Sequence, residues 1–182
     1  MPMLIKVDGD QAVLVDDGFV LLGEEDPAPD GADVIVSLAR FQSEGDSLMA
    51  CGRRVGVRLQ PSEEAEALAY DLPRLAVVEL RFDKFRDGRP YSNAVLLRQR
   101  YGYAGELRAV GDVLREQAQF MLRCGFDAFA PSDGSGPQDW ITATRRYRHV
   151  YQAGADHRTP IYVERAAAKA DGVAKEELEH GL

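Results

Sequence analysis

The sequence predicts an α/β fold of about five βα units around a parallel sheet, as an incomplete TIM-barrel-like or an open sheet, preceded by a small N-terminal antiparallel β meander. Two observations predict this fold class. Short apolar runs that begin near residues 33, 54, 75, 105 and 126 alternate with helix-like segments. The connections between them are short, so each helix returns the chain to start the next strand in the same direction.

The first 32 residues predict the meander and a linker. Their alternation of apolar and polar side chains is interrupted by Asp-Gly turns, which are a strong hairpin signal. Residues 23–31 contain Pro27, Pro29 and several acids, as a linker does. The three predicted strands cover residues 3–7, 12–15 and 19–22.

Residues 33–152 predict the βα-repeat domain. Ser37, Ser62 and Asp112 precede helix-like segments and are predicted N-caps. Gly125 follows the last of these helices and is typical of a helix end. The spacing of about 21 residues between most strands resembles the unit of a (βα) barrel, although a closed barrel needs about eight units. The predicted strands cover residues 34–36, 54–59, 75–82, 106–110 and 126–129.

The chain after residue 130 predicts one more helix and an arm. Pro137 suits a first helical turn. Residues 153–182 predict the C-terminal arm and tail: a lone strand at 159–164, which could add to a sheet edge or reach a second subunit, and then a frayed helix or disordered tail. The helix that begins at Pro137 carries a stripe with helical spacing that predicts core packing, formed by Trp140, Thr144, Tyr147 and Tyr151.

Charge is unevenly placed along the chain, whose formal net charge is −8. Residues 1–32 hold one lysine and eight acids, a net of −7, whereas residues 81–148 hold twelve basic and eight acidic residues, a net of +4. This distribution argues against binding to a nucleic acid backbone, which needs a strongly basic surface. It allows a small anion or an acidic protein partner.

The sequence predicts a cytoplasmic protein without membrane contact. No apolar run approaches the length of a membrane span, and the first residues lack a basic region followed by an apolar block. We therefore expect neither a membrane-spanning segment nor a secretory signal.

No metal site or cofactor is predicted. Cys51 and Cys124 lack the spacing that binds zinc or an iron–sulfur cluster, and the three histidines share no ligand spacing. Both cysteines fall at predicted helix ends on apolar faces, so we expect buried, reduced thiols. The sequence also has no dinucleotide-binding fingerprint and no Walker loop.

Charged residues occupy one face of three neighbouring predicted strands. Side chains alternate between the two faces of a strand, and each strand offers charge near its carboxyl-terminal half: Arg58 in the first, Glu79 and Arg81 in the second, and Arg108 in the third. If the strands are parallel and in order, these residues approach one another. Glu79 would then pair with Arg58 or Arg108, which offsets the cost of burying each charge alone.

Two interpretations of this cluster remain open. In the first, Arg58, Arg81 and Arg108 bind a small anion, because the planar donor fork of arginine matches the oxygens of carboxylate, phosphate or sulfite. Glu79 or Asp83 would be the catalytic acid or base. In the second, the charges form an internal salt-bridge network that only holds the strand ends in register. In the first interpretation a long loop after the strand at 75–82 closes over the anion, with the charged residues Asp83, Lys84, Arg86, Asp87 and Arg89.

Four segments carry a resemblance to a known family. They read DVIVSLARF, FDKFRDGRPYS, LLRQRYGYAGELRAVGDVLREQ and RCGFDAF, in that order, and the resemblance covers about residues 3–130. The chain resembles a conserved bacterial family of unknown function that is encoded beside assimilatory sulfite reductase and is described as a probable oxidoreductase of sulfite reduction. The resemblance implies a role in reducing sulfite to sulfide for cysteine biosynthesis.

Two functions follow as hypotheses. Because the sequence shows no cluster ligands, flavin motif or nucleotide fingerprint, the first is an accessory protein that binds the sulfite reductase haemoprotein or its electron donor. The second is an α/β enzyme that acts on a small anionic metabolite held by the arginines. The exposed edges of an incomplete set of βα units also allow a homodimer.

Overall fold

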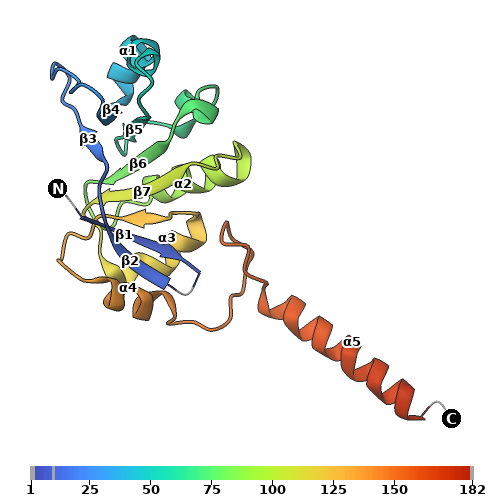
Figure 1. Cartoon of the computed structure of the whole chain (residues 1–182). Coiled ribbons are helices and arrows are strands. Elements are labelled where there is room, and N and C mark those ends of the chain that lie inside the picture. Colours follow the sequence, from blue (N-terminus) through green and yellow to red (C-terminus); the bar gives the residue numbers. More distant parts are fainter. Residues whose placement is uncertain (1–2, 10, 181–182) are drawn as a thin grey trace.

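The computed structural model describes residues 3–9 and 11–180, with side chains through residue 170. It is an α/β fold in which one eight-stranded sheet curls into a half-barrel with helices on its outer face (Figure 1). Strands β3 to β8 run parallel, and β1 is antiparallel to both β8 and β2. In spatial order the strands are β2(Gln11–Asp16), β1(Met3–Asp8), β8(Ala128–Phe129), β7(Glu106–Gly111), β6(Val77–Phe82), β5(Val55–Leu59), β4(Asp33–Ser37) and β3(Phe19–Leu21).

The N-terminal segment contributes strands to both edges of this sheet. The predicted hairpin is present as β1 and β2, but the third strand of the predicted meander is not antiparallel to them. It is β3, which pairs in parallel with β4 at the opposite edge. Alternation in a sequence predicts which faces are buried and leaves the pairing partner open.

The link between β2 and β3 requires the sheet to curl. Only Asp17 and Gly18 separate the two strands, and the three steps from Asp16 to Phe19 reach at most about 11 Å. Eight flat strands would place the two edges roughly 34 Å apart. The edges therefore approach each other where the link passes, and the link lies against the inner face of the sheet.

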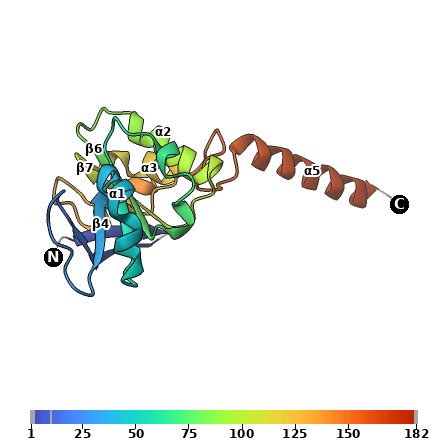
Figure 2. The same cartoon turned by 90° about the horizontal axis from the view of Figure 1, so that it is seen from above.

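Helices cover the outer face of the sheet and enclose the main core (Figures 1 and 2). The Ser37 hydroxyl accepts a hydrogen bond from the Arg40 N–H at 3.1 Å, as the predicted N-cap should. Strand residues such as Val57, Leu80 and Leu107 are fully buried between sheet and helices. The helices are α1(Leu38–Ala50), α2(Arg89–Val95) with the π-helical turn η3(Leu96–Arg100), α3(Ala118–Cys124) and α4(Pro137–Thr144).

Two predicted caps are wrong. The segment after Ser62 forms only two 3₁₀ turns, Ala65–Leu68 and Leu72–Arg74, and neither has a side-chain cap. Pro73 lies in the second turn, where its missing N–H prevents an extended helix. Asp112 instead accepts a hydrogen bond from the Phe85 N–H at 2.9 Å, so it holds the loop that follows β6.

The C-terminal part differs most from the prediction. Trp140 is fully buried in α4, but Tyr147 and Tyr151 lie beyond the end of this helix and are 59% and 77% exposed. The predicted strand at 159–164 is the start of α5(Ile161–His180), which projects from the body (Figures 1 and 2). Pro160 accepts hydrogen bonds from the Val163 and Glu164 N–H groups, and these bonds start the helix.

The two cysteines differ in exposure. Cys124 is buried, and burial raises its pKa to about 11. Cys51 follows the end of α1 and is exposed, so the prediction of a buried thiol is wrong there. Among the residues that the structure describes, no helix has the length and apolar character needed to cross a bilayer.

Candidate functional site

The strand register brings Arg58, Glu79 and Arg108 into one row across β5, β6 and β7. The Arg58 Nε lies 2.7 Å from Glu79 Oε2, and an Nη atom of Arg108 lies 3.4 Å from Glu79 Oε1. Glu79 and Arg108 are each only 2% exposed. The convergence predicted from strand alternation is therefore present, with Glu79 between two guanidinium groups.

Three further charges complete what we call the central ion network. Arg108 also donates to Asp17 from the β2–β3 link at 2.9 Å and to Glu106 on its own strand. Lys6 of β1 lies 2.5 Å from Glu106. The network thus holds three cations and three carboxylates, and its formal charges sum to zero: Lys6, Arg58 and Arg108 against Asp17, Glu79 and Glu106.

The partners keep these groups ionised despite their burial. Burial alone raises the pKa of Glu106, but hydrogen bonds from Lys6 and Arg108 outweigh it and hold that pKa below its usual value. Burial alone lowers the pKa of Arg108, but the hydrogen bond to Glu106 and the negative charges of Glu106, Asp17 and Glu79 together raise it above its usual value. Phe19 adds a ring centred 5.1 Å from the Arg108 guanidinium carbon. Arg108 is therefore a buried cation paired with three carboxylates through its Nε and one Nη atom.

A hollow of about 490 Å³ opens on the inner face of the sheet beside the network. Arg58 and Glu79 line it, together with Arg81. Arg81 does not join the network, since its Nε pairs with Asp83 at 3.0 Å and both side chains are about half exposed. The rest of the lining is mostly apolar and includes Leu4, Phe19, Leu21, Ile35 and Val110.

The loop after β6 does not close over this hollow. Its Phe85 is held by Asp112 through the backbone N–H, and the Gln117 side chain donates to the Phe85 carbonyl at 2.7 Å. Both contacts draw the loop toward the start of α3. None of the predicted loop groups lines the hollow, and the structure leaves them at the carboxyl edge of the sheet: Asp83, Lys84, Arg86, Asp87 and Arg89.

Asp87 and Arg89 form a local pair within that loop. Asp87 accepts from the Arg89 backbone N–H at 3.0 Å and from its guanidinium at 2.6 Å. These hydrogen bonds lower the pKa of Asp87 to about 2. Lys84 and Arg86 are exposed. The loop residues of the predicted site are therefore separate from the central ion network.

Residues 56–162, more than half of the chain, match the model of a family described as "Bacterial protein of unknown function (DUF934)". The chain belongs to this family. No curated protein shows significant similarity to it. The match starts after DVIVSLARF and extends beyond residue 130, so it begins later and ends later than the resemblance predicted.

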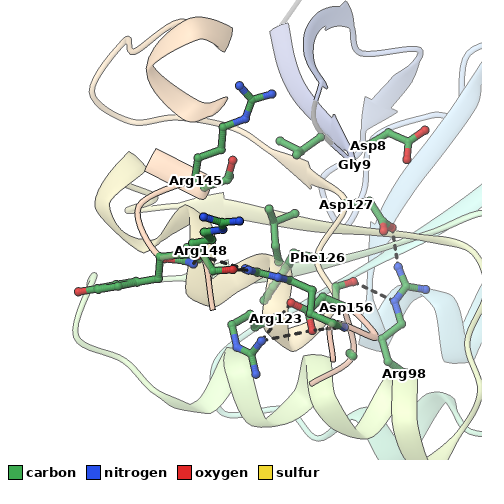
Figure 3. A pocket seen from close by; sticks show the side chains of 17 residues that line it. Asp8, Gly9, Arg98, Arg123, Phe126, Asp127, Arg145, Arg148 and Asp156 are labelled. Carbon is green, nitrogen blue, oxygen red and sulfur yellow. Dashed lines mark hydrogen bonds and ion pairs between the residues drawn. The ribbon is translucent and has the colours of Figure 1, made fainter. Parts of the chain in front are cut away.

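A second charged region, which the sequence did not reveal, lies mostly within the DUF934 match. A hollow of about 580 Å³, here called the arginine hollow, lies where β1 ends and β8 begins, at the amino end of the parallel strands. Figure 3 shows Arg123, Arg145 and Arg148 together on one side of it. Its charged lining residues are Arg98, Arg123, Arg145, Arg148 and Arg158 against Asp8, Asp127 and Asp156.

Several of these arginines hold the fold together. Arg98 donates to the carbonyls of Gly105 at 2.8 Å and Gly125 at 2.9 Å, and pairs with Asp127. Arg123 pairs with Asp156 at 3.2 Å. The arginines are scattered over sixty residues of sequence, which hid the hollow from sequence reasoning. The run Arg-Arg-Tyr-Arg at 145–148 was the one local signal.

Proposed function

We propose that the protein is a cytoplasmic accessory protein of assimilatory sulfite reduction, which binds the sulfite reductase haemoprotein or its electron donor. One observation supports a binding role over a catalytic one. The best-placed candidate base, Glu79, is buried between Arg58 and Arg108 and both of its oxygens have cationic partners. A general base needs a lone pair that can reach a substrate proton.

The arginines of the central ion network support the same reading. Arg108 already binds Asp17, Glu79 and Glu106 through its Nε and one of its Nη atoms. An anion that took over these donors would displace a buried carboxylate, which then loses its partner at a cost of several kcal/mol. The network is best suited to holding β5, β6, β7 and the β2–β3 link in place. The proposed role in sulfite reduction is supported by the resemblance of the four sequence segments to the family encoded beside sulfite reductase.

Growth of a deletion strain tests the pathway. We expect slow growth with sulfate or sulfite as the sole sulfur source and normal growth with sulfide or cysteine. Normal growth on sulfate would remove sulfite reduction from the proposal. Direct binding is measured by calorimetric titration of the full chain with purified haemoprotein and, separately, with its electron donor.

A second candidate function is catalysis on a small anionic metabolite. The hollow of about 490 Å³ beside Arg58, Glu79 and Arg81 favours it, because this hollow is open to solvent and is lined by both charged and apolar side chains. Arg81 is the group to change, since it is about half exposed and lies outside the buried network. If Arg81→Ala fully restores growth of the deletion strain, an anion clamp at Arg81 is excluded. If it fails to restore growth while its melting temperature is unchanged, catalysis or anion binding is favoured.

A further inference from the structure

The arginine hollow continues into a second depression, here called the aromatic groove. The groove has a volume of about 320 Å³ and lies over α3 and residues 147–152. The two depressions share Gln119, Arg123 and Tyr147, so they form one continuous surface.

Large aromatic side chains stand exposed on this surface. Phe120 is 58% exposed, Tyr147 59% and Tyr151 77%. An exposed tyrosine or phenylalanine is ordinary when it is alone, but several of them together mark a place where another molecule binds. The Phe120 ring also packs against Tyr91, with the two ring centres 4.9 Å apart.

The composition of the surface matches the centres of protein–protein interfaces. Its lining combines five arginines with tyrosine and phenylalanine, and lysine is absent from the described residues that line either depression. Arginine and aromatic residues are enriched at interfaces and at their hot spots, whereas lysine is depleted. A small-molecule pocket would be lined mainly by apolar side chains.

The positive charge of the surface indicates an acidic partner. The arginine hollow has five arginines and three aspartates, a difference of +2, within a chain of net charge −8. A positive region on an otherwise acidic protein attracts and orients an acidic partner. Arg148 provides a free cation there, since its guanidinium has no ion pair or hydrogen bond within the part of the chain that the structure describes.

The segment that carries Tyr147 and Arg148 is held in place before any partner arrives. The Gln119 side chain of α3 donates to the Tyr147 carbonyl at 3.2 Å, and Arg158 donates to the carbonyls of Tyr147 and Arg148. The Ala155 N–H donates to the Arg123 carbonyl at 2.8 Å. These contacts reduce the loss of conformational entropy on binding.

We propose that the arginine hollow and the aromatic groove together form the docking surface for a protein partner that presents acidic residues around an aromatic or aliphatic side chain. Arginines would pair with the acidic residues, and the groove between Phe120, Tyr147 and Tyr151 would receive the apolar side chain. The proposal deepens the proposed function and rests on it, because it locates the face through which a partner binds.

A synthetic probe tests the surface independently of any one partner. A random copolymer of glutamate and tyrosine is titrated into the full chain at about physiological salt, with polyglutamate as the reference probe. We expect the copolymer to bind more tightly than polyglutamate. Tyr147→Ala, Tyr151→Ala and Arg148→Ala should each weaken binding about fivefold or more. Tyr70→Ala and Arg86→Ala are the matched controls, because both residues are exposed and lie outside the surface.

The results distinguish an acidic protein partner from the other possible occupants of the surface, a second copy of the chain or a small anion. Absence of copolymer binding, or equal weakening by the control variants, overturns the proposal. Sedimentation that shows a dimer dissociated by Tyr151→Ala assigns the surface to a second copy of the chain and also overturns it. If inorganic phosphate or sulfite binds saturably and Arg148→Ala abolishes this binding, the arginine hollow is a small-anion site. That result also overturns the proposal.

The same variants distinguish this proposal from the proposed function. If the copolymer binds at the surface but neither the haemoprotein nor its electron donor does, the docking surface stands and the sulfite role fails. If one of those proteins binds and all three surface variants bind it as tightly as the wild type, the sulfite role stands and the docking surface is overturned.

Discussion

At the scale of single residues, Arg108 determines the stability of the central ion network. It touches Asp17, Glu79 and Glu106 while only 2% exposed. Arg108→Ala leaves buried carboxylates without their shared cation, so we expect a loss of about 3–5 kcal/mol in the free energy of unfolding. Urea unfolding measures it, with Arg81→Ala, an exposed arginine on the neighbouring strand, as the control. A loss below about 1 kcal/mol for Arg108→Ala would contradict the central role of this residue.

The lowered pKa of Glu106 predicts how the stability of the protein depends on pH. Its pKa in the folded protein lies below the usual value of 4.5. The stabilisation is therefore complete above about pH 4.5 and is lost as the pH falls through the lowered value. Glu106→Gln should destabilise the protein at about pH 7 and much less at about pH 3, as measured by urea unfolding at both. Glu116→Gln, at an exposed glutamate, serves as the control. If Glu106→Gln lowers the free energy of unfolding equally at both pH values, the prediction is contradicted.

At the scale of elements, the end of β7 depends on a glycine. Gly111 has a φ of 95°, and a Cβ there would lie 2.3 Å from the Phe82 carbonyl oxygen of β6. Gly111→Ala therefore combines backbone strain with a clash, and we expect a loss of about 1–3 kcal/mol. Gly88→Ala is the matched control, because its φ is negative and no atom lies within 4 Å of the added carbon. Thermal unfolding of the two variants checks the difference, and equal melting temperatures would refute it.

Sequence reasoning succeeded where short-range periodicity decides the structure. Alternation along β5, β6 and β7 predicted that Arg58, Glu79 and Arg108 would converge if the strands were parallel and in order, and the structure has that order. Sequence reasoning failed where contacts between residues far apart in the sequence determine the structure. The pairing of β3 with β4 depends on the curl of the whole sheet, which no local pattern records.

The same distinction explains the C-terminal errors. Ile161, Tyr162 and Val163 have strand propensity, yet they begin α5, whose first hydrogen bonds run from the Val163 and Glu164 N–H groups to the Pro160 carbonyl. Tyr147 and Tyr151 share helical spacing with Trp140, but α4 ends at Thr144, which leaves both rings exposed. A stripe predicts a buried face only as far as the helix continues.

At the scale of the whole molecule, α5 is separate from the body that the sheet organises. It projects away in both views (Figures 1 and 2), and its residues 162–170 are exposed. Truncation after Glu164 should therefore change the free energy of unfolding by no more than about 0.5 kcal/mol. Glu164 is kept because its carboxylate lies 2.9 Å from the His149 ring. Urea unfolding of the truncated and full-length chains measures the difference, and a loss above about 2 kcal/mol would show that α5 is part of the folded core.

The truncated chain also tests how the molecule associates. The exposed position of α5 allows it to pair with a second copy, and sedimentation of both chains over a range of concentrations reveals this pairing as a dimer that the truncation removes. The arginine hollow and the aromatic groove are lined by residues before 159 and stay intact in the truncated chain. Copolymer binding should therefore survive the truncation even if a dimer does not. Loss of both together would place α5 of a second copy on the docking surface.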